Sequence, residues 1–154
     1  MKYINHFIIF VIAILLQNTA LASEVQDKQS MELDALVYLE QNWSDADRDW
    51  FYFIDQGSRL MPYRIFKSLE QTNNENLLSD SYNLLRFGFL SAKKSKNNPD
   101  GLPVGFTIAD GYLGLNCAAC HTQQLKYKDK FVRIDGGQSM MDLSMFLSVI
   151  EASM

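Results

Sequence analysis

The five residues Cys117-Ala118-Ala119-Cys120-His121 constrain this 154-residue chain more than any other feature. C-x-x-C-H is the attachment signature of a c-type haem. Two thiols three positions apart lie on one side of a helical turn, where both can reach the vinyl groups along one side of the porphyrin. The histidine that follows is then placed to give its imidazole to the iron. The motif therefore predicts one covalent haem c, held by Cys117 and Cys120, with His121 as an axial ligand.

Two other kinds of site use a C-x-x-C pair. A thioredoxin-like or structural disulfide is expected after a strand in a β-α-β unit, and Gly114-Leu115-Asn116 does not indicate such a unit. A structural zinc site needs four ligands, whereas the chain has two cysteines and two histidines. One of those histidines, His6, lies in a segment that we expect to be removed. Haem attachment is therefore favoured over both alternatives.

The first 22 residues are typical of a bacterial export signal. Lys2 precedes an almost wholly apolar run from Ile8 to Leu16, and small residues stand at Ala20 and Ala22, before the expected cleavage site. An uncleaved anchor is the alternative, but the run is well short of the roughly 20 apolar residues that span a bilayer. We therefore expect a periplasmic or secreted protein with no stable membrane span after cleavage. Haem c is attached after export, which agrees with this signal.

The charge balance restricts the partners. Fourteen basic residues against 18 acidic ones give a net charge of −4. Binding to phosphate backbones needs a surplus of Lys and Arg, so no nucleic-acid partner is expected. The lysines of the predicted surface loop Lys93–Pro103 are either a solvated surface or a docking patch for a redox partner protein.

Hydrophobic spacing predicts a mainly α fold with short helices and a small β-hairpin. Together with the C-x-x-C-H motif, it leads us to expect a cytochrome c-like haem domain. We expect Ser44 and Asp47 to cap one helix, Pro62 to begin another, and Ser139 with Asp142 to cap the last. The helices are expected over residues 31–42, 45–56, 62–71, 74–87, 115–124 and from 139 through 150, and the hairpin over 125–134. The chain divides into a signal peptide (1–22), a leader with a helix (23–43) and a cytochrome c-like haem-binding domain (44–154).

The sequence does not identify the sixth ligand of the iron. Met140 or Met141 could supply a thioether, but methionines at helical spacing are more often core residues. Met61 ranks behind both. An open or water-bound position, or a ligand from missing chain, is favoured.

Other side chains could line the haem. We expect Trp50, Phe51 and Phe53 to be core residues, some of which also contact the porphyrin. Three arginines are candidates for its propionates, although each one singly fits a surface ion pair better: Arg59, Arg64 and Arg133.

Four segments around the motif add a resemblance: Trp50–Tyr63, Asn98–Phe106, Leu113–Thr122 and Ile134–Gly137. Together they resemble the N-terminal part of large secreted proteins of the di-haem cytochrome c peroxidase-like family. The rubber-oxygenase-type di-haem cytochromes are related to that family. The resemblance implies that Cys117–His121 is a first haem site. It also implies, for the complete protein, an oxidoreductase that acts on peroxide or oxygen.

The chain departs from that family in length. Family members run to several hundred residues and carry a second C-x-x-C-H motif, whereas this sequence holds one. We therefore expect an incomplete, N-terminal portion whose last helix exposes an apolar face with too few partners, made of Met141, Met145, Phe146 and Val149. An electron-transfer module is the favoured function. The alternative is a peroxidase- or oxygenase-type enzyme, formed only with a missing C-terminal haem domain or, more weakly, a partner subunit that completes the pocket.

Overall fold

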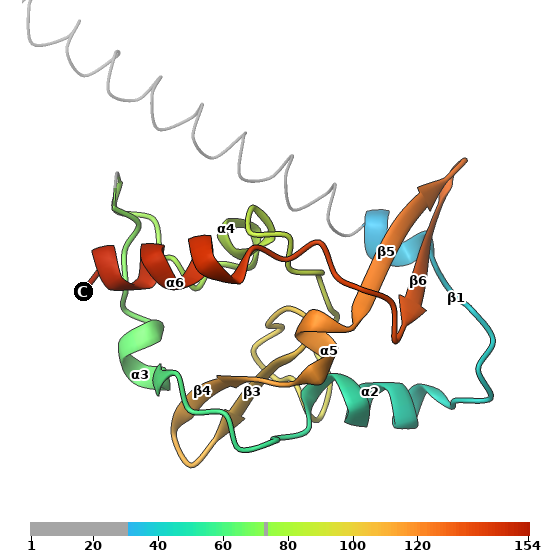
Figure 1. The fold of residues 1–154 in the computed structure, drawn as a ribbon, viewed down its shortest axis with the longest axis horizontal. Helices are drawn as coiled ribbons and strands as arrows, with labels where there is room; N and C mark the ends of the chain where they lie inside the picture. The colour runs from blue at the N-terminus through green and yellow to red at the C-terminus, as the bar shows by residue number, and fades with distance from the viewer. Residues whose placement is uncertain (1–30, 73) are drawn as a thin grey trace, which may run out of the picture.

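The structure is a computed structural model that describes residues 31–72 and 74–154 (Figure 1). The expected signal peptide at residues 1–22 lies outside the described residues. In chain order the elements are β1 (Leu36–Tyr38), α2 (Asp45–Phe53), β2 (Met61–Pro62), α3 (Tyr63–Phe66), α4 (Ser81–Leu85), β3 (Phe106–Ala109), β4 (Tyr112–Leu115), α5 (Cys117–Cys120), β5 (Thr122–Tyr127), β6 (Lys130–Asp135) and α6 (Leu143–Ala152). Among these residues, no helix is long and apolar enough to span a bilayer.

The expectation of a mainly α fold is wrong. Helix makes up 29% of the described structure and strand 22%, and the strands form two three-stranded sheets. One sheet has the order β1-β6-β5, with β1 parallel to β6, and the other has the antiparallel order β2-β4-β3. The expected hairpin is confirmed and is longer than predicted, because β5 begins directly after His121.

Tertiary pairing shortens the predicted helices. Residues 31–34 are helical, but 36–38 pair with β6 as a parallel strand. The helix expected to begin at Pro62 is a single turn, because the chain then reverses and the Leu78 N–H donates to the Leu69 carbonyl (2.8 Å). The helix expected over 74–87 is reduced to α4.

The best-predicted helix is α2. The Ser44 hydroxyl accepts from the Asp47 N–H, and the Asp47 carboxylate accepts from the Ser44 N–H, so both halves of the capping box are present. Trp50 does not join the core, because its side chain is 59% exposed, whereas Tyr52 and Phe53 are buried.

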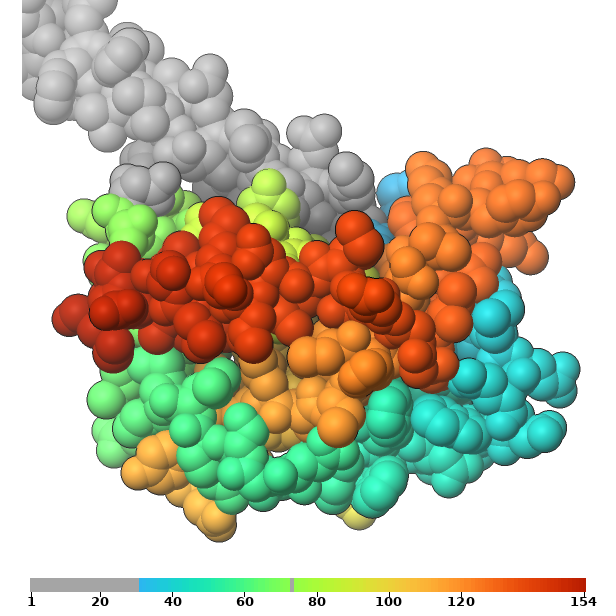
Figure 2. All heavy atoms as spheres, viewed as in Figure 1, coloured from blue at the N-terminus to red at the C-terminus, as the bar shows by residue number. Residues whose placement is uncertain are grey.

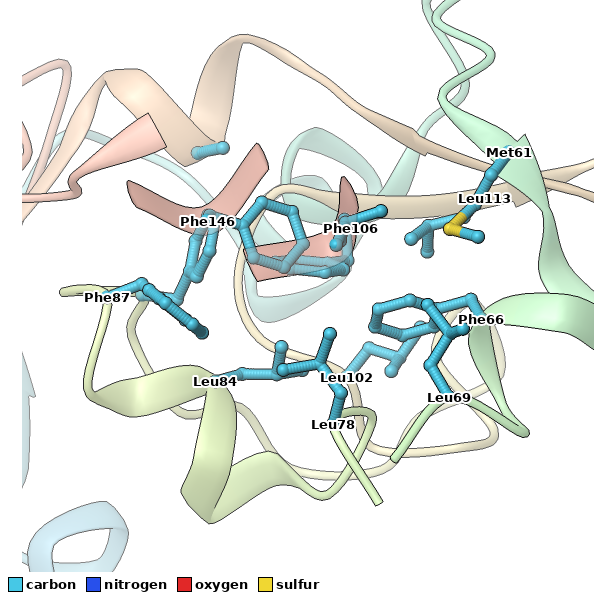
Figure 3. Close-up of a cluster of buried hydrophobic side chains, with 13 residues drawn as sticks. Met61, Phe66, Leu69, Leu78, Leu84, Phe87, Leu102, Phe106, Leu113 and Phe146 are labelled. Carbon is cyan, nitrogen blue, oxygen red and sulfur yellow. The ribbon is translucent and has the colours of Figure 1, made fainter. Parts of the chain in front are cut away.

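Two hydrophobic clusters hold the fold. The larger cluster joins α3, α4, α6 and the β2-β4-β3 sheet around edge-to-face aromatic rings (Figure 3). It consists of Met61, Phe66, Leu69, Leu78, Leu84, Phe87, Phe89, Leu102, Phe106, Leu113, Ala119, Phe146 and Ile150. The smaller cluster consists of Tyr52, Phe53, Val104 and Ala118.

The last helix is better packed than expected. Phe146 is fully buried, with its ring 5.0 Å from that of Phe89 and 5.4 Å from that of Phe87, and Ile150 is also buried. Asp142 caps α6 by accepting from the Met145 N–H, and its own N–H donates to the Phe87 carbonyl (2.7 Å). Met145 remains 49% exposed. The expectation that this face has too few partners is therefore wrong for Phe146, and Met141 and Val149 also pack against the larger cluster.

Candidate functional site

The C-x-x-C-H motif forms α5, a single helical turn between β4 and β5. This turn is much shorter than the helix expected over residues 115–124, because Leu115 ends β4 and Thr122 begins β5. The motif is thus held between two strands of different sheets. Its position is therefore set by both sheets rather than by a long helix.

Asn116 fixes the start of this turn. It is buried, its side-chain oxygen accepts from the Ala118 N–H (3.0 Å), and it thereby caps α5. Its side-chain nitrogen lies within donating distance of the Phe51, Tyr52 and Ile54 carbonyls, at 3.2, 3.3 and 3.0 Å. One side chain therefore joins the C-terminal end of α2 to the N-terminal end of α5.

Gly105 lets the chain pass directly beneath the motif. Its φ is +85°, and a Cβ at this position would lie 2.2 Å from the Ala119 nitrogen. Its N–H donates to the Tyr52 carbonyl (3.1 Å), and its carbonyl accepts from the Asn116 N–H (2.9 Å). Only glycine fits here, because a side chain would meet backbone atoms that cannot move aside.

The motif turns its small residues inward and its reactive residues outward. Ala118 belongs to the smaller cluster and Ala119 to the larger one, so the turn joins the two. Cys117 and Cys120 are exposed free thiols, and His121 is exposed as well. All three side chains predicted to hold haem are therefore available on the surface.

The surface beside α5 is hollowed. Figure 2 shows a depression next to α5, between α6 and the segment that follows α2. That segment touches the motif, because the Gln56 side-chain oxygen accepts from the Cys117 N–H (2.9 Å). On the other side, the Ser139 N–H donates to the Cys120 carbonyl (2.9 Å). α5 therefore borders a recess of the surface.

The three methionines considered as a sixth ligand differ in how deeply they are buried. Met140 directly follows Ser139 and is 79% exposed, so its thioether is free. Met141 packs against the larger cluster, and Met61 is buried within it. Met140 is thus the methionine whose side chain is both close in the chain to a motif contact and uncommitted to the core.

The arginine candidates are mostly engaged elsewhere. Arg59 bonds the carboxylates of Asp55 (2.7 Å) and Asp110 (2.9 Å), and it holds the pKa of Asp55 below its usual range. Arg133 is 1% exposed and donates to the Ser91 carbonyl and to Gln124. Arg64 is exposed.

Sequence reasoning missed a buried polar network next to the motif. The Asp135 carboxylate accepts from the Tyr52 hydroxyl (2.5 Å) and from Arg48 Nε (3.1 Å). Burial, and then the bond to Asp135, raise the pKa of Tyr52 far above its ordinary value. No local sequence pattern links Asp135 to Tyr52 or Arg48, which lie more than 80 positions away in the chain.

The described residues contain no group of three or more His, Cys, Asp or Glu side chains that could hold a bare metal ion. A haem brings four nitrogen ligands of its own. From the chain it needs two thiols and an imidazole, which Cys117, Cys120 and His121 carry. The residues therefore fit a covalent haem.

Comparisons with known proteins show a similarity to a longer protein. The chain is 37% identical over 142 aligned residues to a protein named as uncharacterized protein y4iJ of Sinorhizobium fredii (strain NBRC 101917 / NGR234). The match covers 75% of this chain and 23% of the relative. The chain thus spans about a quarter of the length of the curated relative it matches. No family model matches, and no solved structure matches.

Proposed function

We propose that this chain carries one covalent haem c on α5 and transfers electrons through it as an exported module. The observation that carries the proposal is the division of the motif, in which Ala118 and Ala119 are buried while Cys117, Cys120 and His121 are exposed. A disulfide or a buried structural role needs no imidazole at the surface. Covalent haem attachment requires both thiols and the imidazole to be accessible.

The attachment chemistry suits two free thiols. Each thiol adds across one vinyl double bond, so that a sulfur–carbon bond forms and the thiol hydrogen goes to the neighbouring carbon. No electrons are lost overall, so the thiols must be reduced when the haem arrives. When bound, the haem supplies a one-electron couple at its iron, whose potential the axial ligands set.

The chain itself supplies the surroundings of that couple. His121 gives the imidazole, Asn116 and Gln56 hold the start of the motif, and the Ser139 N–H holds the Cys120 carbonyl. Exposure of the motif favours electron exchange with a redox partner protein. A second ligand to the iron would be water or the thioether of Met140.

The longer relative favours a second candidate function. Because the match spans 23% of that protein, the same region can serve as one haem-bearing part of a larger oxidoreductase. In that case a second haem-bearing domain is the partner. This is the arrangement that resemblance to the di-haem cytochrome c peroxidase-like family implies, with peroxide or oxygen as substrate.

The test is absorption spectroscopy of the exported, matured protein. His121→Ala should lose the native Soret and visible bands while the haem stays attached through the thiols. Met140→Ala tests the candidate thioether, and Met154→Ala, at a similarly exposed methionine (77%), is its control. A free second position should bind added imidazole or cyanide readily in the wild type. An unchanged spectrum in His121→Ala would overturn the assignment of the ligand.

A further inference from the structure

We infer that Asp135 is the positioning residue that fixes His121, and that α2 thereby clamps the motif at both of its ends. This inference rests on the proposed function, because His121 matters as a ligand only when haem is attached. Asn116 already ties α2 to the start of the motif. The contacts of Asp135 tie the same helix to the residue at its other end.

The backbone connects Asp135 directly to His121. Asp135 is the last residue of β6 and pairs with Thr122, the residue after His121. The next residue, Gly136, donates its N–H to the His121 carbonyl (2.8 Å). The His121 backbone is therefore held from the end of β6, and any shift of Asp135 moves that contact.

The side chain of Asp135 is anchored to α2. It is 1% exposed and accepts from the Tyr52 hydroxyl and from Arg48 Nε, two residues one turn apart on that helix. Arg48 is itself buried and lies 3.9 Å above the ring of Tyr38. The Gln41 side chain also donates to the Asp135 carbonyl (3.0 Å).

A buried ion pair of this kind adds little net stability, because desolvation of two charges offsets their attraction. The hydrogen bonds of the pair are nevertheless directional, so they fix the position of Asp135 relative to α2. Asp135 acts on His121 through the backbone, because Asp135 pairs with Thr122 and the Gly136 N–H holds the His121 carbonyl. A backbone fixed at His121 limits the directions in which its imidazole can point, and this is the role that we assign to the buried carboxylate.

The test compares two gentle variants with a matched control. Asp135→Asn keeps the size of the side chain but removes its charge, and Tyr52→Phe removes only one hydroxyl and keeps the buried ring. Leu78→Ala, in the larger cluster, destabilises the fold without touching α2 or β6. Each protein is matured with haem, and its denaturation midpoint, ferric electron paramagnetic resonance and reduction potential are measured.

We expect both network variants to shift the resonance positions, which report the orientation of the imidazole, and the reduction potential. Leu78→Ala should lower the denaturation midpoint and leave both readouts at their wild-type values. The inference is overturned if the network variants match the wild type, or if Leu78→Ala shifts the readouts equally. If Asp135→Asn does not fold, Tyr52→Phe decides.

Failure of the proposed function would be seen separately, as a wild-type protein without covalent haem. In that event, amide exchange is measured on the haem-free chain. Exchange of the Gly136 N–H should be about tenfold faster in Tyr52→Phe than in a Leu78→Ala protein, after correction for global stability. Equal exchange rates in the two variants would overturn the inferred clamp, whether or not haem is attached.

Discussion

The two hydrophobic clusters meet at α5, but they are built differently. The larger cluster is apolar throughout and packs aromatic rings from four parts of the chain together, with Phe106 within 6.4 Å of Phe66, Phe89 and Phe146. The smaller cluster has few apolar members and borders the network of Asp135, Tyr52 and Arg48. The comparison indicates that the larger cluster supplies most of the stability, while the smaller one and its network set the orientation of the motif.

The largest expected effect is on the larger cluster. Phe106→Ala should cost about 3–5 kcal/mol of unfolding free energy, because a buried ring is lost and a cavity remains. Val104→Ala, in the smaller cluster, removes less apolar surface and should cost about 2 kcal/mol at most. Urea unfolding followed by circular dichroism measures both. Equal or reversed costs would contradict the assignment of stability to the larger cluster.

Two glycine substitutions test the comparison at α5, where the two clusters meet. Gly105→Ala should move α5, because the new Cβ would meet the Ala119 backbone. Gly111→Ala is the matched control, with a similar φ of +78° and no atom within 4 Å, so it should cost only about 1–2 kcal/mol of backbone strain. The Gly105 variant should lose more stability and also carry less covalent haem. Equal haem loading in the two variants would show that the close approach does not position the motif.

The smallest expected effect is a difference in alkaline stability. The pKa of Tyr52 is raised in the folded state, so its contribution is complete below the unfolded value near pH 10 and is lost as the pH rises towards the folded value. Above about pH 10, the wild type should therefore lose stability more steeply than Tyr52→Phe, by at most about 1.4 kcal/mol per pH unit. Denaturation midpoints from pH 9 to about 11 test this. Parallel curves would mean that Tyr52 is not held in the buried network.

Sequence patterns predicted the local signals well. The Ser44–Asp47 capping box and the hairpin depend on neighbouring residues, and both are present. The predicted helices were too long because apolar spacing does not reveal that Leu36–Tyr38 and Met61–Pro62 pair with distant strands. These pairings turn an expected mainly α fold into a mixed one.

The candidate site divides in the same way. The motif alone identifies Cys117, Cys120 and His121 as candidate haem-binding residues, because haem attachment requires a fixed spacing. Asn116, Gly105 and Asp135 act through residues far away in the chain, so their roles follow only from the folded arrangement. An asparagine that caps two helices at once has no signature in a single sequence.

Intact mass under denaturing conditions tests the central claim most directly. The chain is exported in cells that attach haem c, purified, and compared with a Cys117→Ala/Cys120→Ala variant. The account predicts that the wild type exceeds its polypeptide mass by one haem, which stays attached on unfolding, and that the variant carries none. A wild-type mass without haem, lighter than the reduced polypeptide by the two hydrogen atoms of a Cys117–Cys120 disulfide, would contradict it.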